Sequence, residues 1–251
     1  FFNDLNISPN HDKANVVYPS VNKKKFYSKK EKIILFVGKL NYSKGFDIFC
    51  KAITRILDEF PNWKSYVIGD EPRAQIDVEH KNLTKLGFLN HDKVLGYYDR
   101  ASIAVGCSKW EEPMGRVGLE SSSRGCATII SAKGGLPETI TNGIILNPVN
   151  EEQVYQAIKK LIQDSAYRKK LCYLSYKNFK NDLNNSVRKY DEIRDKVFNT
   201  KLNGTIFSVN KNPSLRIMHV TNFAERHDGR LYFVSIGQKI SNGFIRSGHS
   251  V

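Results

Sequence analysis

Residues 108–135 read S-K-W-E-E-P-M-G-R-V-G-L-E-S-S-S-R-G-C-A-T-I-I-S-A-K-G-G. A Pro-Met-Gly turn comes first, and the pattern after it predicts a helix over residues 116–124. The apolar run A-T-I-I-S at residues 127–131 then predicts a strand, because a short apolar run without alternation is typical of a strand that is covered on both faces. A helix followed by such a strand is the unit from which parallel sheets are built.

Two glutamates flank the turn in this stretch. Glu112 stands just before it, and Glu120 follows eight residues later, inside the predicted helix. Backbone N–H groups at a helix start are unpaired and carry partial positive charge, so they attract anions such as phosphate. Carboxylates accept hydrogen bonds from hydroxyl groups. The stretch therefore favours a ligand that is part phosphate and part polyol, as a nucleotide-sugar is. The alternative is that both glutamates only follow the preference of acidic residues for helix N-termini.

The same alternation of strands and helices continues on both sides of this stretch. Predicted strands span residues 33–38, 65–69, 102–106, 127–131 and 144–146, with a short strand at 16–18 and a segment without assigned type at 83–89. Predicted helices span residues 46–60, with Ser43 as N-cap, 92–100, 116–124, 137–141 and two or three segments within 151–197. This order predicts an α/β fold: a parallel sheet with helices on both faces.

Charged residues follow the ends of several predicted strands. Three of the predicted strands end in glycine, at Gly38, Gly69 and Gly106. The strand that ends at Gly38 is followed by Lys39 and Lys44, and the strand that ends at Gly106 is followed by Glu112. In open α/β sheets ligands bind at the carboxyl edge. The pattern therefore predicts one binding site at that edge, although both lysines are also explained as solvated loop residues.

Composition excludes several classes of protein. The longest strongly apolar run, residues 33–37, is far too short to cross a bilayer. The four cysteines form no Cys-x-x-Cys pair and no zinc-ligand spacing with histidine, so no disulfide framework and no metal site are expected. Among single residues, we expect Cys107 and Cys126 in the core and His91 and His249 at the surface. The protein itself is expected in the cytoplasm.

The net charge of +14 favours acidic partners such as phosphorylated substrates, nucleic acid or an anionic membrane face. Aromatic residues do not interleave with the lysines as a base-stacking platform requires, so no nucleic acid is expected as a partner. The alternative explanation of the charge is a general enrichment in lysine on solvated faces.

Four motifs together resemble a known family. They are V-G-K-L-N-Y-S-K-G (residues 37–45), V-I-G-D (67–70), E-P-M-G-R-V-G-L-E (112–120) and G-G-L-P-E (134–138). In this order and spacing they resemble the C-terminal, donor-binding domain of retaining GT-B glycosyltransferases of family 4, over residues 15–197. The resemblance implies a Rossmann-like sheet that binds a nucleotide-diphosphate sugar without cofactor or metal.

The resemblance also implies roles for single residues. Lys44 matches the lysine that neutralises the donor diphosphate, and Lys39 stands where many members carry an arginine, which offers a bidentate fork that lysine lacks. Glu112 matches the catalytic-site glutamate that faces the donor sugar, and Glu120 the one that grips the ribose hydroxyls.

Further donor-binding positions follow from the same motifs. Met114, Gly115, Arg116 and Val117 match the segment whose backbone N–H groups meet the diphosphate and sugar, and many relatives carry Phe in place of the methionine. Two additional positions complete the predicted donor site: Gly38 and Leu89, the latter in a segment near the base. The Gly134-Gly135 pair is also explained as no more than a tight turn.

The resemblance predicts four segments. Residues 1–30 are a lead-in from a missing N-terminal domain, and residues 31–199 are the donor domain. Residues 200–214 are a linker. Residues 215–251 resemble the strand, loop and helix that begin a second GT-B N-terminal domain, which adds a short β-α piece at the C-terminus.

The predicted activity is transfer of a glycosyl group to a glycan or lipid-linked acceptor, with this chain inactive on its own because the acceptor domain is missing. Peripheral contact with an anionic membrane at the inner face is an accessory expectation. Two alternatives stay open: a GT-B sugar-nucleotide epimerase, and a basic, non-catalytic binding module.

Overall fold

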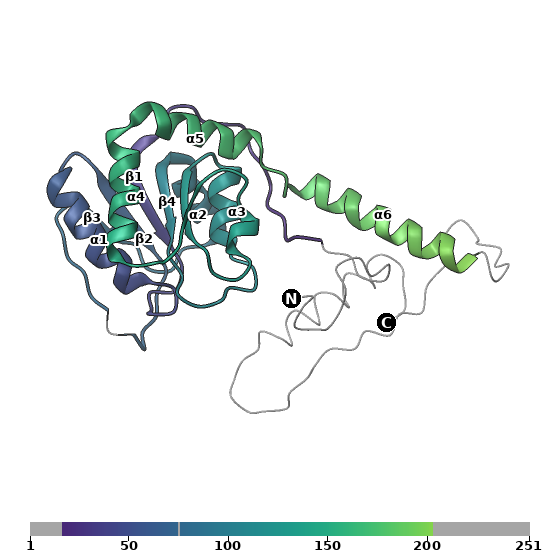
Figure 1. Cartoon of the computed structure of the whole chain (residues 1–251), viewed down its shortest axis with the longest axis horizontal. Helices are drawn as coiled ribbons and strands as arrows, with labels where there is room; N and C mark the ends of the chain where they lie inside the picture. Colours follow the sequence, from purple (N-terminus) through teal and green to yellow (C-terminus); the bar gives the residue numbers. More distant parts are fainter. Residues whose placement is uncertain (1–16, 75, 203–251) are drawn as a thin grey trace. The chain divides into compact units, whose positions relative to one another are not determined.

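The computed structural model of the chain describes residues 17–74 and 76–202, with side chains up to residue 196. Within this part, six parallel strands form one sheet in the order β3-β2-β1-β4-β5-β6 (Figure 1). The strands are β1 (Glu31–Val37), β2 (Lys64–Ile68), β3 (Leu83–Lys85), β4 (Ala101–Gly106), β5 (Ala127–Ser131) and β6 (Ile144–Leu146). The helices are α1 (Phe46–Glu59), α2 (His91–Arg100), α3 (Arg116–Ser123), α4 (Glu151–Gln163), α5 (Ser165–Lys177) and α6 (Leu183–Leu202), with one 3-10 turn, η1 (Leu136–Thr139).

The predicted α/β class, a Rossmann-like parallel sheet covered on both faces, is confirmed. The central strand β1 shows why its sequence lacks alternation: Ile34 and Phe36 pack into one hydrophobic cluster, and Ile33 and Leu35 into another on the opposite face. Because neighbouring side chains of a strand point to opposite faces, both must be apolar when both faces are buried.

Helices cover the two faces unequally. The larger cluster joins α1 and α4 to the sheet, and the smaller one joins α2 (Figure 1). Apolar residues of α1 at helical spacing, among them Phe49, Ile53 and Ile56, are fully buried in the larger cluster. This packing holds the strand ends in fixed positions and so builds a rigid edge for a site.

The chain reverses direction across the sheet between β1 and β4. From β1 it proceeds outward through β2 and β3, then returns to form β4 on the other side and continues through β5 and β6. The register pairs Ile34 with Ile103 and Phe36 with Val105. At such a reversal the loops after the two central strands diverge, which opens a crevice at their carboxyl ends.

Local predictions fail at two places. Ser43 does not cap α1: the N-cap is Gly45 in the left-handed conformation, with φ of 70° and no side-chain cap. Residues 17 and 18 form no strand, and instead Val21 makes an isolated parallel bridge with Asp182. In both cases contacts between distant segments decide the local conformation.

The chain divides into two compact units between Arg194 and Asp195. α6 extends to Leu202, so it includes the first residues of the predicted linker. The remainder of that linker and the predicted β-α piece at residues 215–251, with His249, lie outside the described residues, as do residues 1–16 of the predicted lead-in.

Candidate functional site

A pocket of about 470 Å³ lies at the carboxyl ends of β1 and β4, where the chain reverses across the sheet. Nine of the ten predicted site residues line it. They are Gly38, Lys44, Leu89, Glu112, Met114, Gly115, Arg116, Val117 and Glu120. Eight further residues complete the lining: Phe36, Val37, Phe88, His91, Val94, Gly106, Ser108 and Leu136. The two glutamates thus share one cavity.

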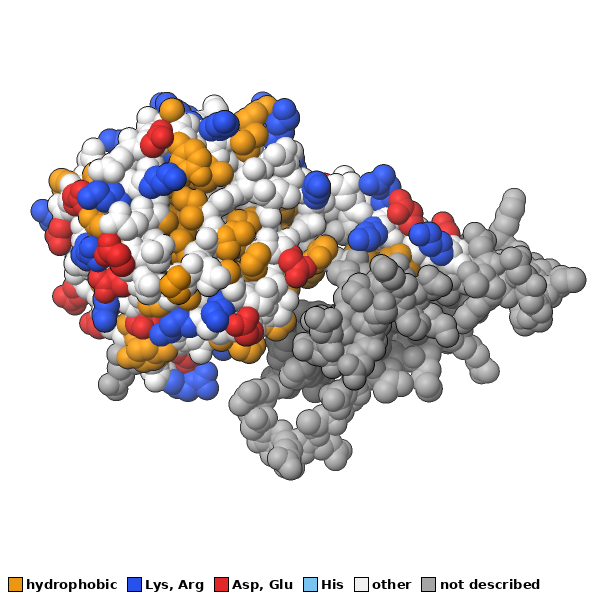
Figure 2. Space-filling view, in the orientation of Figure 1, with side chains coloured by type: hydrophobic (Ala, Val, Ile, Leu, Met, Phe, Trp, Pro, Cys, Tyr) orange, Lys and Arg blue, Asp and Glu red, His pale blue; other side chains and the backbone are white. Residues whose placement is uncertain are grey.

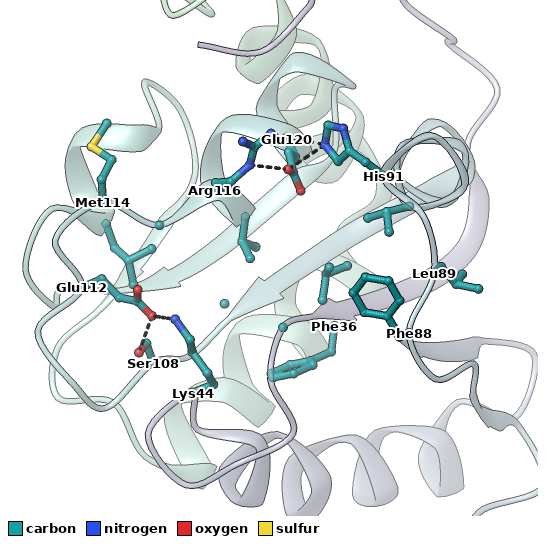
Figure 3. A pocket seen from close by; sticks show the side chains of 17 residues that line it. Phe36, Lys44, Phe88, Leu89, His91, Ser108, Glu112, Met114, Arg116 and Glu120 are labelled. Carbon is teal, nitrogen blue, oxygen red and sulfur yellow. Dashed lines mark hydrogen bonds and ion pairs between the residues drawn. The ribbon is translucent and has the colours of Figure 1, made fainter. Parts of the chain in front are cut away.

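Glu112 is held at one end of the pocket by two partners (Figure 3). The Lys44 ammonium forms an ion pair with its Oε1 atom, and the Ser108 hydroxyl donates to the same atom over 2.9 Å. The carboxylate is only 8% exposed, whereas the lysine side chain is 31% exposed. A buried carboxylate needs such partners, because an unpaired charge in this position is costly.

The backbone of Glu112 contacts Gly134 and Gly135, the glycine pair of the G-G-L-P-E motif. The Gly135 N–H donates to the Glu112 carbonyl over 2.7 Å. Gly134 has φ of 55°, and a Cβ atom there would lie 2.1 Å from the same carbonyl oxygen. The pair is therefore more than a tight turn: only glycine lets the two backbones approach, and this contact positions the glutamate.

Glu120 lies at another end of the pocket and is 6% exposed. Its Oε1 atom accepts from Arg116 Nε over 2.9 Å and lies 3.0 Å from His91 Nε2 (Figure 3). The same histidine Nε2 also lies 3.3 Å from the Arg116 Nη2 group, which only donates, so its role as donor or acceptor depends on the tautomer of the ring. Among the described residues no group bonds to Oε2, so that oxygen is free to accept a hydrogen bond from a ligand.

Ser108 and Phe88 line the pocket without having been predicted there, and so does His91. The histidine was predicted as a surface residue, and its side chain is indeed 53% exposed, yet it lines the pocket and contacts Glu120. It is the first residue of α2, capped by Asn90, whose side chain accepts from the Lys93 N–H. The only sequence signal was its place two residues after Leu89.

The start of α3 lies between the two glutamates. Its N-cap is Gly115, which makes no side-chain cap hydrogen bond, and the first turn holds no acidic residue. Gly115, Arg116 and Val117 line the pocket. Backbone N–H groups at an uncapped helix start are free to bind an anion, and the helix dipole favours one there.

A third side of the pocket is apolar and lies between β3 and α2 (Figure 3). Leu89 and Val94 line it together with Phe88, which is 78% exposed. A large aromatic side chain in this exposed position offers a flat face to a ligand ring.

Lys39 is the predicted residue that does not line the pocket. It follows Gly38 at the end of β1 and is exposed. Its role in phosphate binding stays a prediction.

Cys107 is buried beneath the site, as expected of a core residue. Its Sγ atom donates to the Gly45 carbonyl over 3.2 Å, which ties the end of β4 to the start of α1. Burial raises the pKa of this thiol to about 12, so it is protonated and unreactive. Cys126 is also buried, and burial likewise raises its pKa to about 12.

The described residues contain no group of three His, Cys, Asp or Glu side chains that would hold a metal ion. The described helices include none that is long and apolar enough to cross a membrane.

Comparisons with known proteins agree with this geometry. Residues 19–178 match the family described as glycosyl transferases group 1. A curated relative, an uncharacterised glycosyltransferase of Methanocaldococcus jannaschii, is 34% identical over 149 residues, which cover 55% of this chain and 37% of that protein. The chain therefore spans little more than a third of this relative's length.

Solved structures show the same fold. The C-terminal domain of a group 1 family glycosyl transferase from Francisella tularensis is 26% identical, with a TM-score of 0.52, and the match covers 64% of this chain and 93% of that domain. An Anabaena protein solved in complex with UDP-glucose is 17% identical, with a TM-score of 0.58, and the match covers 67% of this chain and 50% of that protein.

Proposed function

Because the chain belongs to the group 1 glycosyl transferases, we propose that it is the donor-binding part of such an enzyme and holds a nucleotide-diphosphate sugar in the pocket. One observation carries the proposal: the cavity joins two buried glutamates, a lysine and an uncapped helix start. These groups suit hydroxyls and phosphates, the two chemical parts of that donor. The Anabaena protein, whose structure contains UDP-glucose, has the same fold.

Each wall of the pocket has a proposed partner on the donor. The diphosphate lies between Lys44 and the start of α3, with Lys39 reaching it from outside. The free oxygen of Glu120 accepts from the ribose hydroxyls, and Glu112 faces the sugar. The base lies next to Leu89 and Phe88.

The proposed reaction is metal-independent transfer with retention of the anomeric configuration. As the bond between sugar and diphosphate breaks, negative charge grows on the leaving diphosphate. The lysine ammonium and the N–H groups at the start of α3 stabilise that charge, because they are already aimed at the site where it develops. Retention is supported by the resemblance to family 4 alone.

The acceptor is proposed to be a glycan or a lipid-linked glycan, and its binding site to lie on a further domain that faces this pocket. The proposed location is the cytoplasm, with peripheral contact at the inner face of a membrane. The isolated chain is then expected to bind donor but to show no robust transfer, which a radiolabelled transfer assay measures.

Titration calorimetry of the chain with UDP- and GDP-sugars tests the proposal, with and without a chelator. We expect saturable binding of one nucleotide series that EDTA does not change, and weakened binding in Lys44→Ala. The control Lys133→Ala removes an exposed lysine that is paired with Glu111 and does not line the pocket. Absence of binding, or equal loss in both variants, contradicts the proposal.

A GT-B sugar-nucleotide epimerase would bind the same donor. Product analysis separates the two reactions, because an epimerase converts the nucleotide-sugar without any acceptor. The arrangement of two glutamates around one helix start matches the transferase motif and favours transfer.

A further inference from the structure

A second charged feature lies at the opposite edge of the sheet from the pocket. It consists of residues 22–32, which lead into β1, and of α5, and we call these two segments the basic edge. The ring of Phe26 joins the segments: its centroid lies 6.1 Å from that of Tyr173 and 5.0 Å from that of Tyr176. Two stretches far apart in the sequence thus form one surface.

The first segment is anchored at the amino ends of the strands. The Lys30 ammonium donates to three backbone carbonyl oxygens, those of Tyr98, Asp99 and Arg124, over 2.9, 2.8 and 2.6 Å. These residues precede β4 and β5. Because all strands are parallel, this edge lies away from their carboxyl ends, where the pocket is found.

The basic edge carries ten Lys and Arg side chains and a single acidic one, Glu31. Glu31 is already bound by Arg100, over 2.7 and 3.0 Å. None of the ten cations forms an ion pair with a residue in the described part of the chain. The exposed ones are Lys24, Lys25, Lys29, Lys32, Lys169, Lys170 and Lys177.

Elsewhere on the domain some exposed lysines, such as Lys51 and Lys81, also lack an ion pair with a described residue, but other cations are paired. Arg55, for example, pairs with Glu151 and Glu152, and Lys85 pairs with Asp77. Clustered like charges repel one another and disfavour the compact state, whereas an anionic partner relieves that repulsion. The basic edge concentrates ten cations around a single acidic side chain, and this local excess of positive charge points to a partner with negative charge.

Exposed tyrosines accompany the lysines. Tyr27 is 53% exposed and Tyr173 is 48% exposed. Figure 2 shows Lys and Arg side chains beside hydrophobic ones along the edge of the domain that α5 forms. Tyrosine favours the headgroup level of a bilayer, where its ring meets apolar chains and its hydroxyl meets water, and clustered lysines favour anionic lipids.

Nucleic acid fits this surface less well. Base stacking needs open ring faces, but the rings of Tyr173 and Tyr176 contact Phe26. They are also covered by Lys177 and Lys23, whose amino groups lie 5.6 and 4.3 Å from the respective ring centroids. Among the rings of this edge that are described, Tyr27 alone has no such neighbour.

We propose that the basic edge docks onto an anionic phospholipid membrane. The donor pocket, at the opposite edge, stays open when it does. The proposal gives a surface to the membrane contact proposed above, and it does not depend on donor binding.

Sedimentation with lipid vesicles tests the proposal on the full chain. One set contains phosphatidylcholine alone, and the other contains phosphatidylcholine and phosphatidylglycerol in equal parts. We expect binding to the second set only, and loss of that binding at high salt, because salt screens exposed charges.

Two triple variants locate the surface. Lys24→Gln/Lys25→Gln/Lys29→Gln should weaken binding to the anionic vesicles about 100-fold, since each lysine contributes about fivefold at such a surface. The control Lys51→Gln/Lys81→Gln/Lys93→Gln makes the same change in net charge at exposed lysines outside the basic edge, and should change binding much less.

Both variants should keep the wild-type melting temperature and donor affinity, which separates this proposal from the proposed function. Equal weakening in the two variants, absence of binding to the anionic vesicles, or tighter binding of a single-stranded oligonucleotide with the same dependence on the first three lysines would each overturn it.

Discussion

The substitution Glu120→Ala tests the proposal that Glu120 binds the ribose of the donor while Glu112 faces its sugar. In the structure the Glu120 Oε1 atom is occupied by Arg116 and His91, which leaves Oε2 for the ligand. A hydrogen bond from a hydroxyl to a charged acceptor contributes about 1.5–3 kcal/mol. Loss of one such bond to a ribose hydroxyl should weaken binding about 10- to 150-fold. Arg116 is 60% exposed, so losing its partner adds little cost.

The assay is calorimetry with two ligands, the nucleotide-sugar and the corresponding nucleoside diphosphate. Both contain the ribose, so Glu120→Ala should weaken both by the same factor. Glu112→Ala should weaken the nucleotide-sugar more than the nucleoside diphosphate, because only the former carries the sugar. Glu152→Ala, on the exposed side of α4, should change neither. A Glu120→Ala effect confined to the sugar-containing ligand refutes the assignment.

Four further predictions concern stability and thiol chemistry. Gly134→Ala should lower the free energy of unfolding, measured in urea, by about 2–4 kcal/mol, because it strains the backbone and clashes with Glu112. In the matched variant Gly96→Ala the new Cβ meets nothing within 4 Å, so the free energy of unfolding should rise by up to about 1 kcal/mol. Asn150→Ala should cost about 1 kcal/mol in the same assay, because the asparagine side chain caps α4. All four cysteines are buried, so none should react with a thiol reagent at pH 8 until guanidinium unfolds the chain. Burial raises the pKa of three of them to about 12, so the free energy of unfolding should fall as pH rises above about 8.5, where unfolded thiols ionise.

The sequence predicted the sheet well because burial on both faces leaves an unmistakable pattern. β5 and β6 have the predicted bounds, whereas β1 begins two residues earlier and ends one residue earlier than predicted. Helix α3 also agrees closely with its prediction: it begins at the predicted Arg116 and ends one residue before the predicted end. In each of these segments the local pattern and the tertiary environment demand the same residue types.

The sequence failed where a contact between distant segments decides the conformation. Ser43 is a good local N-cap, yet Gly45 is the N-cap of α1. The chain at Gly45 approaches the Cys107 carbonyl so closely that a Cβ would lie 1.9 Å from its oxygen. His91 was missed for a similar reason, since its partner Glu120 is remote in the sequence and lies on another helix.

The motifs predicted which residues line one pocket, but not how its charges pair. Neither spacing nor composition indicates that Lys44 pairs with Glu112, or that Arg116 and His91 share one oxygen of Glu120. The sequence also did not predict that Lys39 lies outside the pocket lining, because nothing in a sequence distinguishes an exposed loop lysine from a ligand-binding one.

Under the proposed function, the ion pair between Lys44 and Glu112 would affect which sugars the pocket binds. A free monosaccharide meets an acid that is already satisfied by an ammonium group and by the Ser108 hydroxyl, so it gains little by entering. The proposed nucleotide-diphosphate sugar would draw the ammonium toward its diphosphate and release the acid for the sugar. The proposed donor pocket would therefore favour activated sugars over free ones.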